Sequence, residues 1–345
     1  MSPRVRDGRD AEFYDDDDGS DVFERSTGYS RPRTKVRPDY SKAKLGTVLG
    51  VDRGRFEVLL DAADAGAGGT PLTVRAMKAR QLGRKGVIVG DRVRLTGDTS
   101  GNTGSLARIA SVDERTTVLR RTADDDDPFE RPIVANADQL LIVTALADPP
   151  PRPGMIDRML VAAYDAHIAP ILCLTKADLA PADELLAQYG PLNIPIAEVQ
   201  PGGGLDAVRA LLNAHITVFV GHSGVGKSTL INALIPDANR VTGEVNAVTG
   251  RGRHTSTSAL ALALPGSTGW VIDTPGVRSF GLSHVDVDSV LGAFPDLAEI
   301  ATHCPRGCTH QSTSPDCAIQ AALESGALDP ARLASLRRIL TALHG

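Results

Sequence analysis

Residues 216–235 hold an apolar run, a glycine-rich loop and a helical pattern in direct succession, and no other stretch restricts the fold as strongly. The loop at 221–228 reads GHSGVGKS and fits the phosphate-binding pattern G-x-x-x-x-G-K-[ST]. The apolar run before it, Ile216–Val220, predicts a buried strand, and the run after it, Lys227–Ile235, predicts a helix that Pro236 ends. Glycines let the backbone curl so that N–H groups and the helix N-terminus hold phosphate oxygens, which predicts a nucleotide site.

Two further motifs have the spacing of a guanine-nucleotide site. The sequence Asp-Thr-Pro-Gly at 273–276 follows the predicted strand Trp270–Ile272. Its aspartate can hold Mg²⁺ through a water molecule, and its glycine N–H can meet the γ-phosphate. The sequence Thr-Lys-Ala-Asp at 175–178 follows the predicted strand Pro170–Leu174 and fits the guanine-reading pattern [NT]-K-x-D. A carboxylate at Asp178 can accept two hydrogen bonds from guanine, whereas adenine would leave it unpaired.

The order of the three motifs is rearranged along the chain. An ordinary GTPase runs from phosphate loop to acidic motif to guanine motif, whereas here the guanine motif comes first, so we predict a circularly permuted GTPase. The residues predicted to bind nucleotide are Thr175, Lys176, Asp178, Gly221, His222, Ser223, Gly224, Val225, Gly226, Lys227, Ser228, Thr229, Asp273 and Gly276. Among them Lys227 is expected to reach the β- and γ-phosphates, while Ser228 and Asp273 are expected to hold Mg²⁺.

The polar, glycine-rich segment at 250–257 lies where the first switch loop of a GTPase belongs. We expect Thr255 to place its hydroxyl on Mg²⁺ and the γ-phosphate, with Thr257 as the second candidate. Val277 stands after the acidic motif, where many GTPases have a Gln that orients the attacking water, and its side chain cannot hydrogen-bond. His254 is therefore the predicted catalytic residue that positions water, and contact with RNA alone is the alternative role for it.

Three of the four cysteines crowd into a short segment near the C-terminus, and a histidine lies between them. The predicted metal ligands are Cys304, Cys308, His310 and Cys317. Three thiolates and one imidazole satisfy the tetrahedral shell of a structural zinc ion, which would stabilise a segment with few aromatic residues. His303 is an alternative fourth ligand, and free thiols or a disulfide are the alternatives to a metal. The fourth cysteine, Cys173, falls in an apolar strand and is expected in the core.

The N-terminal residues 1–44 alternate basic with acidic side chains and hold few apolar ones, so we expect a disordered charged tail. An RNA-binding arm is an alternative, although its acids and bases nearly balance. The formal net charge of the chain is −5, so any binding to nucleic acid must rest on local basic patches. The N-terminus lacks an apolar signal region and no apolar run approaches the ~18 residues of a membrane span, which predicts a cytoplasmic protein with no membrane partner.

The rest of the chain divides into three predicted domains. Short β-rich runs over 45–122 predict a small barrel such as an OB-fold, and its Arg and Lys cluster between 75 and 94 predicts RNA binding, with a solvated basic face as the alternative. These predicted strands are Thr47–Val51, Phe56–Leu60, Leu72–Ala76, Asp91–Leu95, Ala107–Val112 and Thr117–Leu119. Alternating strands and helices over 130–283 predict an α/β P-loop GTPase domain, and 284–345 a helical zinc-binding domain.

Together these residues resemble the circularly permuted GTPases that act in maturation of the small ribosomal subunit, the RsgA or YjeQ family. The resemblance covers about residues 45–340 and rests on the phosphate loop, G-R-G-R-H-T at 250–255, D-T-P-G at 273–276 and the Cys3His segment. It implies an OB-fold, a permuted GTPase domain and a zinc domain, with one Zn²⁺ per chain and Mg²⁺ with GTP. It also implies a monomer that binds the small ribosomal subunit and its rRNA late in assembly and hydrolyses GTP to GDP and phosphate when stimulated by it.

Two positions depart from the family pattern. The family usually has Asn at the position of Thr175, where it bridges guanine N7 to the phosphate loop. Thr is shorter, so the sequence leaves open whether Thr175 makes this bridge. The usual base loop of the Ser-Ala type is absent, because the register places it near Glu198 and Val199, and neither has a small hydroxyl side chain.

Two other functions stay open from the sequence. One is an ATPase of the same loop class, against which Lys176 and Asp178 argue. The other is a nucleotide-binding RNA or ribosome adaptor without significant turnover. The adaptor predicts no phosphate release even when small ribosomal subunits are present.

Overall fold

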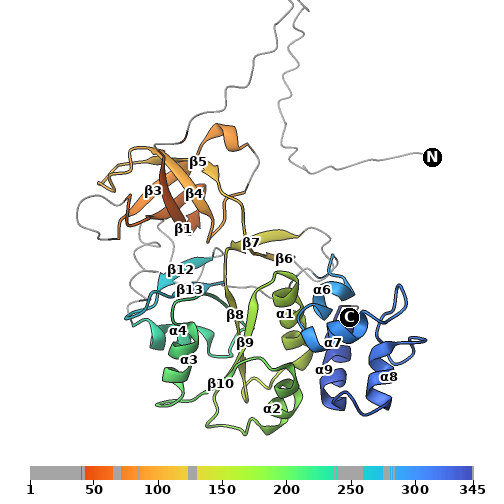
Figure 1. The fold of residues 1–345 in the computed structure, drawn as a ribbon. Coiled ribbons are helices and arrows are strands. Elements are labelled where there is room, and N and C mark those ends of the chain that lie inside the picture. The colour runs from red at the N-terminus through yellow and green to blue at the C-terminus, as the bar shows by residue number, and fades with distance from the viewer. Residues whose placement is uncertain are drawn as a thin grey trace, which may run out of the picture. The chain divides into compact units, whose positions relative to one another are not determined.

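The structure describes most of the chain beyond its N-terminal tail. The computed structural model describes residues 40, 43–64, 71–83, 86–122, 130–236, 238, 259–274, 280, 282 and 284–343. These residues fall in one structural unit, Tyr40–Gly345 (Figure 1). The predicted disorder of the tail at 1–44 falls almost wholly outside the described residues.

Within the described chain, five strands following the tail close into a small barrel (Figure 1). They are β1 (Lys44–Asp52), β2 (Arg55–Leu60), β3 (Thr73–Lys78), β4 (Arg92–Gly97) and β5 (Ala107–Val112), with a 3₁₀ turn η1 (Arg80–Leu82) after β3. The sheet closes because β1 pairs with both β2 and β4, and β5 pairs with both β3 and β4. Alternate side chains point inward, and Val48, Val58 and Val93 have no exposed surface. The predicted small barrel is confirmed, with five of its six predicted strands.

The sixth strand predicted for the barrel belongs elsewhere. It forms β6 (Val118–Arg121), which pairs antiparallel with β7 (Arg131–Ala135), a strand that the pattern did not predict. The residues just before β4 make a close backbone contact with the end of β7, because a Cβ at Gly90 would lie 1.9 Å from the carbonyl oxygen of Ala135. Gly90 has a φ of 87°, and the N–H of Ala135 donates to the carbonyl of Val89 at 2.9 Å.

The α/β part is built on a sheet of six strands in the described residues. They are β8 (Gln139–Ala145), β9 (Ala169–Thr175), β10 (Ile196–Val199), β11 (Ile216–Val220), β12 (Leu260–Ala263) and β13 (Trp270–Asp273). Their order is β10-β9-β8-β11-β13-β12, and neighbours are parallel except for β12 with β13. The apolar strands β8 and β9 are buried along nearly their whole length, as strands covered on both faces must be. One pair, Gly50 with Leu260, continues the sheet into β1.

Helices cover both faces of this sheet. The core on one face includes residues of α3 (Leu205–Leu212) and α4 (Lys227–Leu234), around the fully buried Phe219. The core on the other face includes residues of α1 (Pro153–Asp165) and α2 (Asp183–Tyr189), which a 3₁₀ turn η2 (Gly190–Leu192) extends. The predicted α/β layers with a mostly parallel sheet are confirmed.

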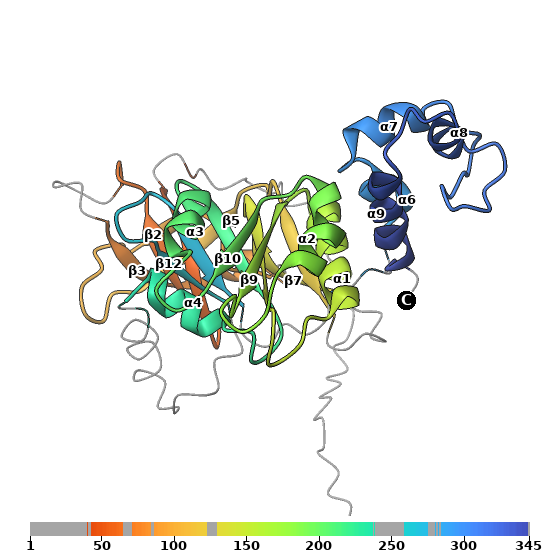
Figure 2. The same cartoon turned by 90° about the horizontal axis from the view of Figure 1, so that it is seen from below.

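The C-terminal part is helical, and Figure 2 shows its helices grouped together in blue. They are α6 (Val287–Leu291), α7 (Pro295–Ala301), α8 (Ala318–Glu324) and α9 (Pro330–Thr341). Asp286 caps α6 by accepting from the Ser289 N–H at 2.7 Å, and Asp329 caps α9 from the Ala331 N–H at 2.9 Å. The sequence analysis did not predict α7 as a separate helix, which Pro295 can start from its first position.

Two arginines of α9 bind residues of the GTPase part. The Nε of Arg338 lies 3.1 Å from both carboxylate oxygens of Asp157 on α1. Its guanidinium also stacks on the ring of Tyr189, 4.7 Å from the ring centroid. Arg332 donates from Nη1 to the carbonyl oxygen of Pro191 at 2.7 Å. The side chains of Asp157 and Arg338 are only 5% and 25% exposed, so this ion pair is largely shielded from water.

The apolar side of α9 completes the core on that face of the sheet. Leu336 and Ile339 are fully buried and belong to the same hydrophobic cluster as Leu160 of α1 and Leu172 of β9. The cysteine segment therefore attaches to helices that share one core with the sheet. In the part of the chain described here, no helix has both the length and the apolar character that crossing a bilayer needs.

Candidate functional site

The three predicted nucleotide motifs meet at one edge of the sheet. Thr175 ends β9, the phosphate loop follows β11, and Asp273 ends β13. These strands are parallel and lie in the order β9-β8-β11-β13. Their carboxyl ends therefore face the same way, and ligands of open α/β sheets bind at that edge. The rearranged order along the chain does not separate the motifs in space.

The phosphate loop joins β11 to α4 and has the backbone that a phosphate cradle requires. Gly224 and Gly226 have φ angles of 85° and 90°, which side-chain-bearing residues rarely adopt. At Gly221 a Cβ would lie 2.5 Å from the carbonyl oxygen of Val143 on β8. Val225 is fully buried and anchors the loop from below. These positions explain why the loop needs its glycines.

The two predicted phosphate and Mg²⁺ groups lie side by side. Lys227 Nζ donates to Asp273 Oδ1, which brings the first residue of α4 onto the end of β13. Thr274 Oγ1 donates to the carbonyl oxygen of Phe219 at 2.7 Å and fixes the acidic motif against β11. Residues 228–229 are exposed in the first turn of α4, where a hydroxyl can reach a bound cation. The arrangement fits a magnesium–phosphate group held by one cation, one carboxylate and one hydroxyl.

Thr175 connects the guanine segment to the phosphate loop. Its Oγ1 lies 2.5 Å from the carbonyl oxygen of Val225 and 3.2 Å from that of Thr144. The side chain is buried, with 5% of the residue exposed. Thr175 therefore reaches the phosphate loop although its side chain is shorter than Asn. The sequence had left open whether it makes this contact.

The remaining guanine-segment residues face outward from this anchor. Lys176 has a φ of 57°, and its Nζ donates to the carbonyl oxygen of Asp148 on the loop after β8. Asp178 is exposed, so its carboxylate is accessible to a base. The segment is braced from β10, because the N–H of Ala177 donates to the carbonyl oxygen of Val199 at 3.2 Å.

Several predicted site residues fall outside the described residues. These are His254 and Thr255 of the first switch segment, the second candidate Thr257, and Gly276 of the acidic motif. Their predicted roles stay predictions.

His222 of the phosphate loop has one ring nitrogen with a hydrogen-bond partner and one without a partner among the described residues. Its Nδ1 lies 2.8 Å from the carbonyl oxygen of Ser223, so in the neutral ring Nδ1 donates and Nε2 carries the lone pair. That Nε2 is buried, and no hydrogen-bond partner reaches it from the described chain. The motif pattern gave this position no side-chain role, because it allows any residue there.

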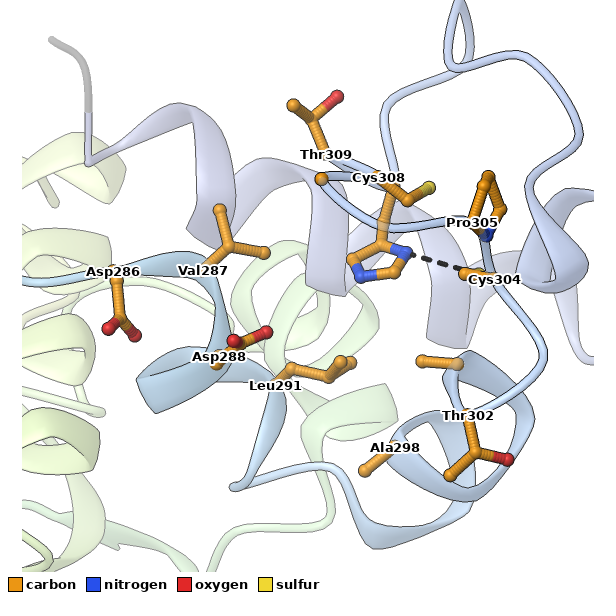
Figure 3. Close-up of a pocket in the computed structure, with 13 residues that line it drawn as sticks. Asp286, Val287, Asp288, Leu291, Ala298, Thr302, Cys304, Pro305, Cys308 and Thr309 are labelled. Atoms are coloured by element: carbon orange, nitrogen blue, oxygen red, sulfur yellow. Dashed lines mark hydrogen bonds between the residues drawn. The ribbon is translucent and has the colours of Figure 1, made fainter.

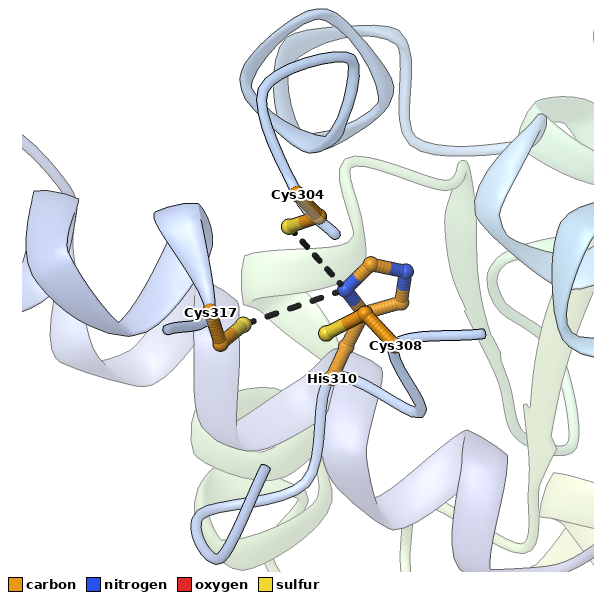
Figure 4. A group of neighbouring side chains, drawn as sticks. All are labelled: Cys304, Cys308, His310 and Cys317. Carbon is orange, nitrogen blue, oxygen red and sulfur yellow. Dashed lines mark hydrogen bonds between the residues drawn. The ribbon is translucent and has the colours of Figure 1, made fainter. Parts of the chain in front are cut away.

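The cysteine segment gathers the four predicted metal ligands at one point (Figure 4). The sulfur and nitrogen atoms of Cys304, Cys308, His310 and Cys317 all lie within 4.8 Å of one another. His310 Nδ1 lies 3.7 Å from Cys304 Sγ and 3.8 Å from Cys317 Sγ. A tetrahedral zinc ion with ordinary bond lengths would separate such atoms by about 3.6 Å. The donor set and its spacing therefore fit a metal ion, and the predicted metal site is supported by geometry.

The local environment shifts the pKa values of the cluster residues in different directions, because burial raises the pKa of Cys317 and disfavours its thiolate. Burial opposes the Cys308 thiolate, but a hydrogen bond from the His310 backbone and bonds with Cys317 and Cys304 lower the Cys308 pKa overall. Burial lowers the pKa of His310, which favours the neutral imidazole. Cys173 lies in β9, where burial, with no compensating hydrogen bond from the described residues, raises the thiol pKa to about 12. It is therefore an inert thiol of the core.

A cavity of about 520 Å³ opens beside the cluster (Figure 3). The N-terminal turn of α6, α7 and the cysteine segment line it, with Asp286 and Asp288 contributing its acidic groups. The alternative ligand His303 is not part of the cluster, and its Nδ1 lies 3.2 Å from Thr302 Oγ1. No pattern in the sequence indicated this cavity, because its walls come from separate short elements.

A histidine that follows the acidic motif bridges two carboxylates, and the sequence analysis did not predict this contact. His284 Nδ1 lies 2.6 Å from Glu130 Oε1, and His284 Nε2 lies 2.8 Å from Asp165 Oδ2. Burial lowers the His284 pKa, but the bonds to both carboxylates outweigh it and raise the pKa overall. The partners lie more than a hundred residues away in the sequence, so no local signal could have found this contact.

The basic cluster of the barrel is partly neutralised. Arg92 pairs with Asp61, and Arg94 Nε lies 3.1 Å from Asp113 Oδ1. The fully buried Asp91 is not a surface acid, because Arg115 binds it through two hydrogen bonds of 2.7 and 2.9 Å. Counting charges along the sequence therefore overstated the positive charge that this part of the barrel presents.

The sheet order, the phosphate loop, the guanine segment and the motif order together define a circularly permuted GTPase with a barrel before it and a Cys3His cluster after it. The family model described as RsgA GTPase matches residues 112–283. The "Small ribosomal subunit biogenesis GTPase RsgA" of Pseudomonas aeruginosa is 41% identical over 266 residues, covering 74% of this chain and 76% of the relative. The protein of the same name from Azotobacter vinelandii is 40% identical and covers 74% of this chain and 75% of the relative. The chain belongs to the RsgA GTPase family.

Solved structures agree with this assignment. The crystal structure of YjeQ from Thermotoga maritima matches with a TM-score of 0.65 and 25% identity, covering 88% of this chain and 99% of that one. A structure titled as YloQ, a circularly permuted GTPase, matches with a TM-score of 0.62 and covers 88% of this chain and 96% of that one. At 23% identity the second likeness shows the fold alone.

Proposed function

We propose that this chain binds the small ribosomal subunit and acts late in its assembly, hydrolysing GTP to GDP and phosphate when the subunit stimulates it. The observation that carries the proposal is its 41% identity, over most of both chains, to a protein named for small ribosomal subunit biogenesis. The convergence of guanine segment, phosphate loop and acidic motif at one sheet edge supports the nucleotide chemistry. A cytoplasmic monomer is part of the same proposal.

Each part of the nucleotide site has a proposed role. Lys227 neutralises the β- and γ-phosphates, Ser228 and Asp273 hold Mg²⁺, and Asp178 reads the base. Thr255 completes the Mg²⁺ shell and Gly276 meets the γ-phosphate. When bound, Mg²⁺ neutralises charge that develops on the phosphate oxygens during transfer to water.

The domains outside the sheet have proposed roles as well. We propose an OB-fold over residues 45–122 that contacts rRNA, the GTPase domain over 130–283, and a zinc domain over 284–345. Zinc at Cys304, Cys308, His310 and Cys317 is structural in this proposal, because four protein ligands leave no open position for chemistry. The charged tail at 1–44 is proposed to be disordered.

Phosphate release from GTP, measured with and without purified small ribosomal subunits, tests the proposal. We expect slow release by the chain alone and a rise of at least about tenfold with subunits, because ordering of switch segments can raise GTPase rates by ~10³. Lys227→Ala serves as the inactive control. No release above that control with subunits present would favour the adaptor, and equal competition by ATP would favour the ATPase.

Guanine specificity is expected to depend on Asp178. In Asp178→Asn, preference for GTP over ATP should fall by about 100-fold, since an amide offers one acceptor to the two donors of guanine and adds a donor where none is wanted. The matched control is Asp183→Asn, which removes the same charge from an exposed position nearby on α2. Competition binding with both nucleotides measures the effect, and unchanged discrimination in Asp178→Asn would rule the assignment out.

A further inference from the structure

The hydroxyl of Thr175 sits between two carbonyl oxygens beneath the phosphate loop. Its Oγ1 lies 2.5 Å from the Val225 oxygen and 3.2 Å from the Thr144 oxygen. The contact is enclosed, because Thr175 is 5% exposed and Val225 has no exposed surface. A Cβ at Gly226 would lie 3.6 Å from the same Oγ1, so the loop backbone passes directly over it.

Hydrogen-bond accounting limits what this side chain can do. Both neighbours are carbonyl oxygens and can only accept, whereas a hydroxyl has a single hydrogen to donate. The shorter contact places that hydrogen on the Val225 oxygen. An Asn at this position would carry two amide hydrogens and could serve a loop carbonyl and a further acceptor together. Guanine N7 is such an acceptor and has no hydrogen of its own.

The nearest cationic side chain of the segment is held elsewhere. Lys176 Nζ donates to the carbonyl oxygen of Asp148, on the loop that follows β8. Asp178, the exposed acid of the segment, can accept from the base but cannot donate when ionised. The described side chains of the guanine segment thus offer acceptors to the N1–H edge of guanine and no evident donor to its N7 edge.

We propose that Thr175 makes only one of the two contacts that an Asn could make at this position. It connects the guanine segment to the phosphate loop but does not bind guanine N7. The proposal rests on the proposed function, in which GTP is the nucleotide bound. Base specificity then does not depend on N7, and Asp178 accepts from the N1–H and exocyclic amine of guanine. The chain accepts guanine nucleotides altered at N7, which a GTPase with Asn at this position disfavours.

The test compares GTP with 7-deaza-GTP, in which a C–H replaces N7. Dissociation constants are measured on the full chain by displacement of a fluorescent GDP analogue. We expect the wild-type chain to bind the two nucleotides within about twofold. Thr175→Asn should prefer GTP by about five- to tenfold, which corresponds to one regained hydrogen bond.

A second variant separates the tether from base reading. Thr175→Val keeps the branched shape and removes the hydroxyl, so both nucleotides should weaken by a similar factor, about fivefold, and their ratio should stay near one. This arm and the wild-type ratio decide the matter even if Thr175→Asn does not fold. A wild-type preference for GTP of more than about twofold would overturn the proposal, as would a preference that Thr175→Val abolishes.

Failure of the proposed function gives a different pattern. ATP is included as a competitor in every titration. If the GDP probe does not bind, or ATP displaces it as well as GTP does, the chain is not a GTP-selective protein and the N7 proposal falls with the proposed function. If GTP binds selectively but 7-deaza-GTP does not, only the N7 proposal fails.

Discussion

Replacing His254 with Ala is expected to lower subunit-stimulated GTP turnover by about 10³-fold, with GTP affinity and subunit binding retained. The chain has Val277 where many GTPases place a water-orienting Gln, and Val277 offers no hydrogen bond. His254 stands beside Thr255, the predicted Mg²⁺ hydroxyl, and its imidazole can orient water.

The measurement is single-turnover phosphate release with saturating small subunits, alongside a sedimentation assay for binding. His215→Ala is the matched control. It removes an imidazole that precedes β11, at the end of the strand away from the phosphate loop, and the side chain there is 47% exposed. We expect this control to retain stimulation. Full stimulated hydrolysis by a His254→Ala chain that binds the subunit normally would leave His254 with an RNA-contact role only.

The double substitution Cys304→Ser with Cys308→Ser is expected to reduce bound zinc from about one ion per chain to none. Both residues supply ligand atoms to the cluster, and serine is a poor zinc ligand. Structural zinc in small domains contributes ~10–16 kcal/mol of apparent binding free energy at neutral pH, so its loss should unfold the segment between α7 and α8. Elemental analysis measures the metal, and amide hydrogen exchange measures the loss of order between α7 and α8.

Cys173→Ala is the matched control for this experiment. It removes a thiol that lies in β9, outside the cluster, so zinc should stay bound at full stoichiometry. Zinc retained by the double serine variant would remove Cys304 and Cys308 as ligands. Zinc lost from the Cys173→Ala control would point to general unfolding rather than to ligand removal.

The sequence predicted the parts of the fold whose signals are local. The phosphate loop combines fixed glycines with a buried strand and a helix, and all three follow from neighbouring residues. The cysteine segment was predictable for the same reason, because thiols so close in sequence can meet at one ion. Elements with short or weak patterns escaped, among them β7, β10, β12 and α7. Four-residue strands such as Ile196–Val199 give too few alternations to distinguish them from loops.

Contacts between distant residues could not be predicted from one sequence. The bond from Thr175 to Val225 spans fifty residues, and it depends on β9 and β11 lying two strands apart. The pairing of Arg92 with Asp61 changes the charge of the barrel in the same way. The sequence showed a shorter side chain at Thr175 and a basic cluster on the barrel. The fold determines which groups these side chains contact.

Because α9 and α1 pack in one core, the parts on either side of the proposed domain boundary at residue 283 are not independently stable. A fragment that ended there would expose the apolar side of Leu160 and remove the ion pair that Arg338 makes with Asp157. Heat should therefore melt the nucleotide-binding sheet and the cysteine-bearing helices in one cooperative transition. We expect a chain that ends at residue 283 to lose GTPase activity together with its stability.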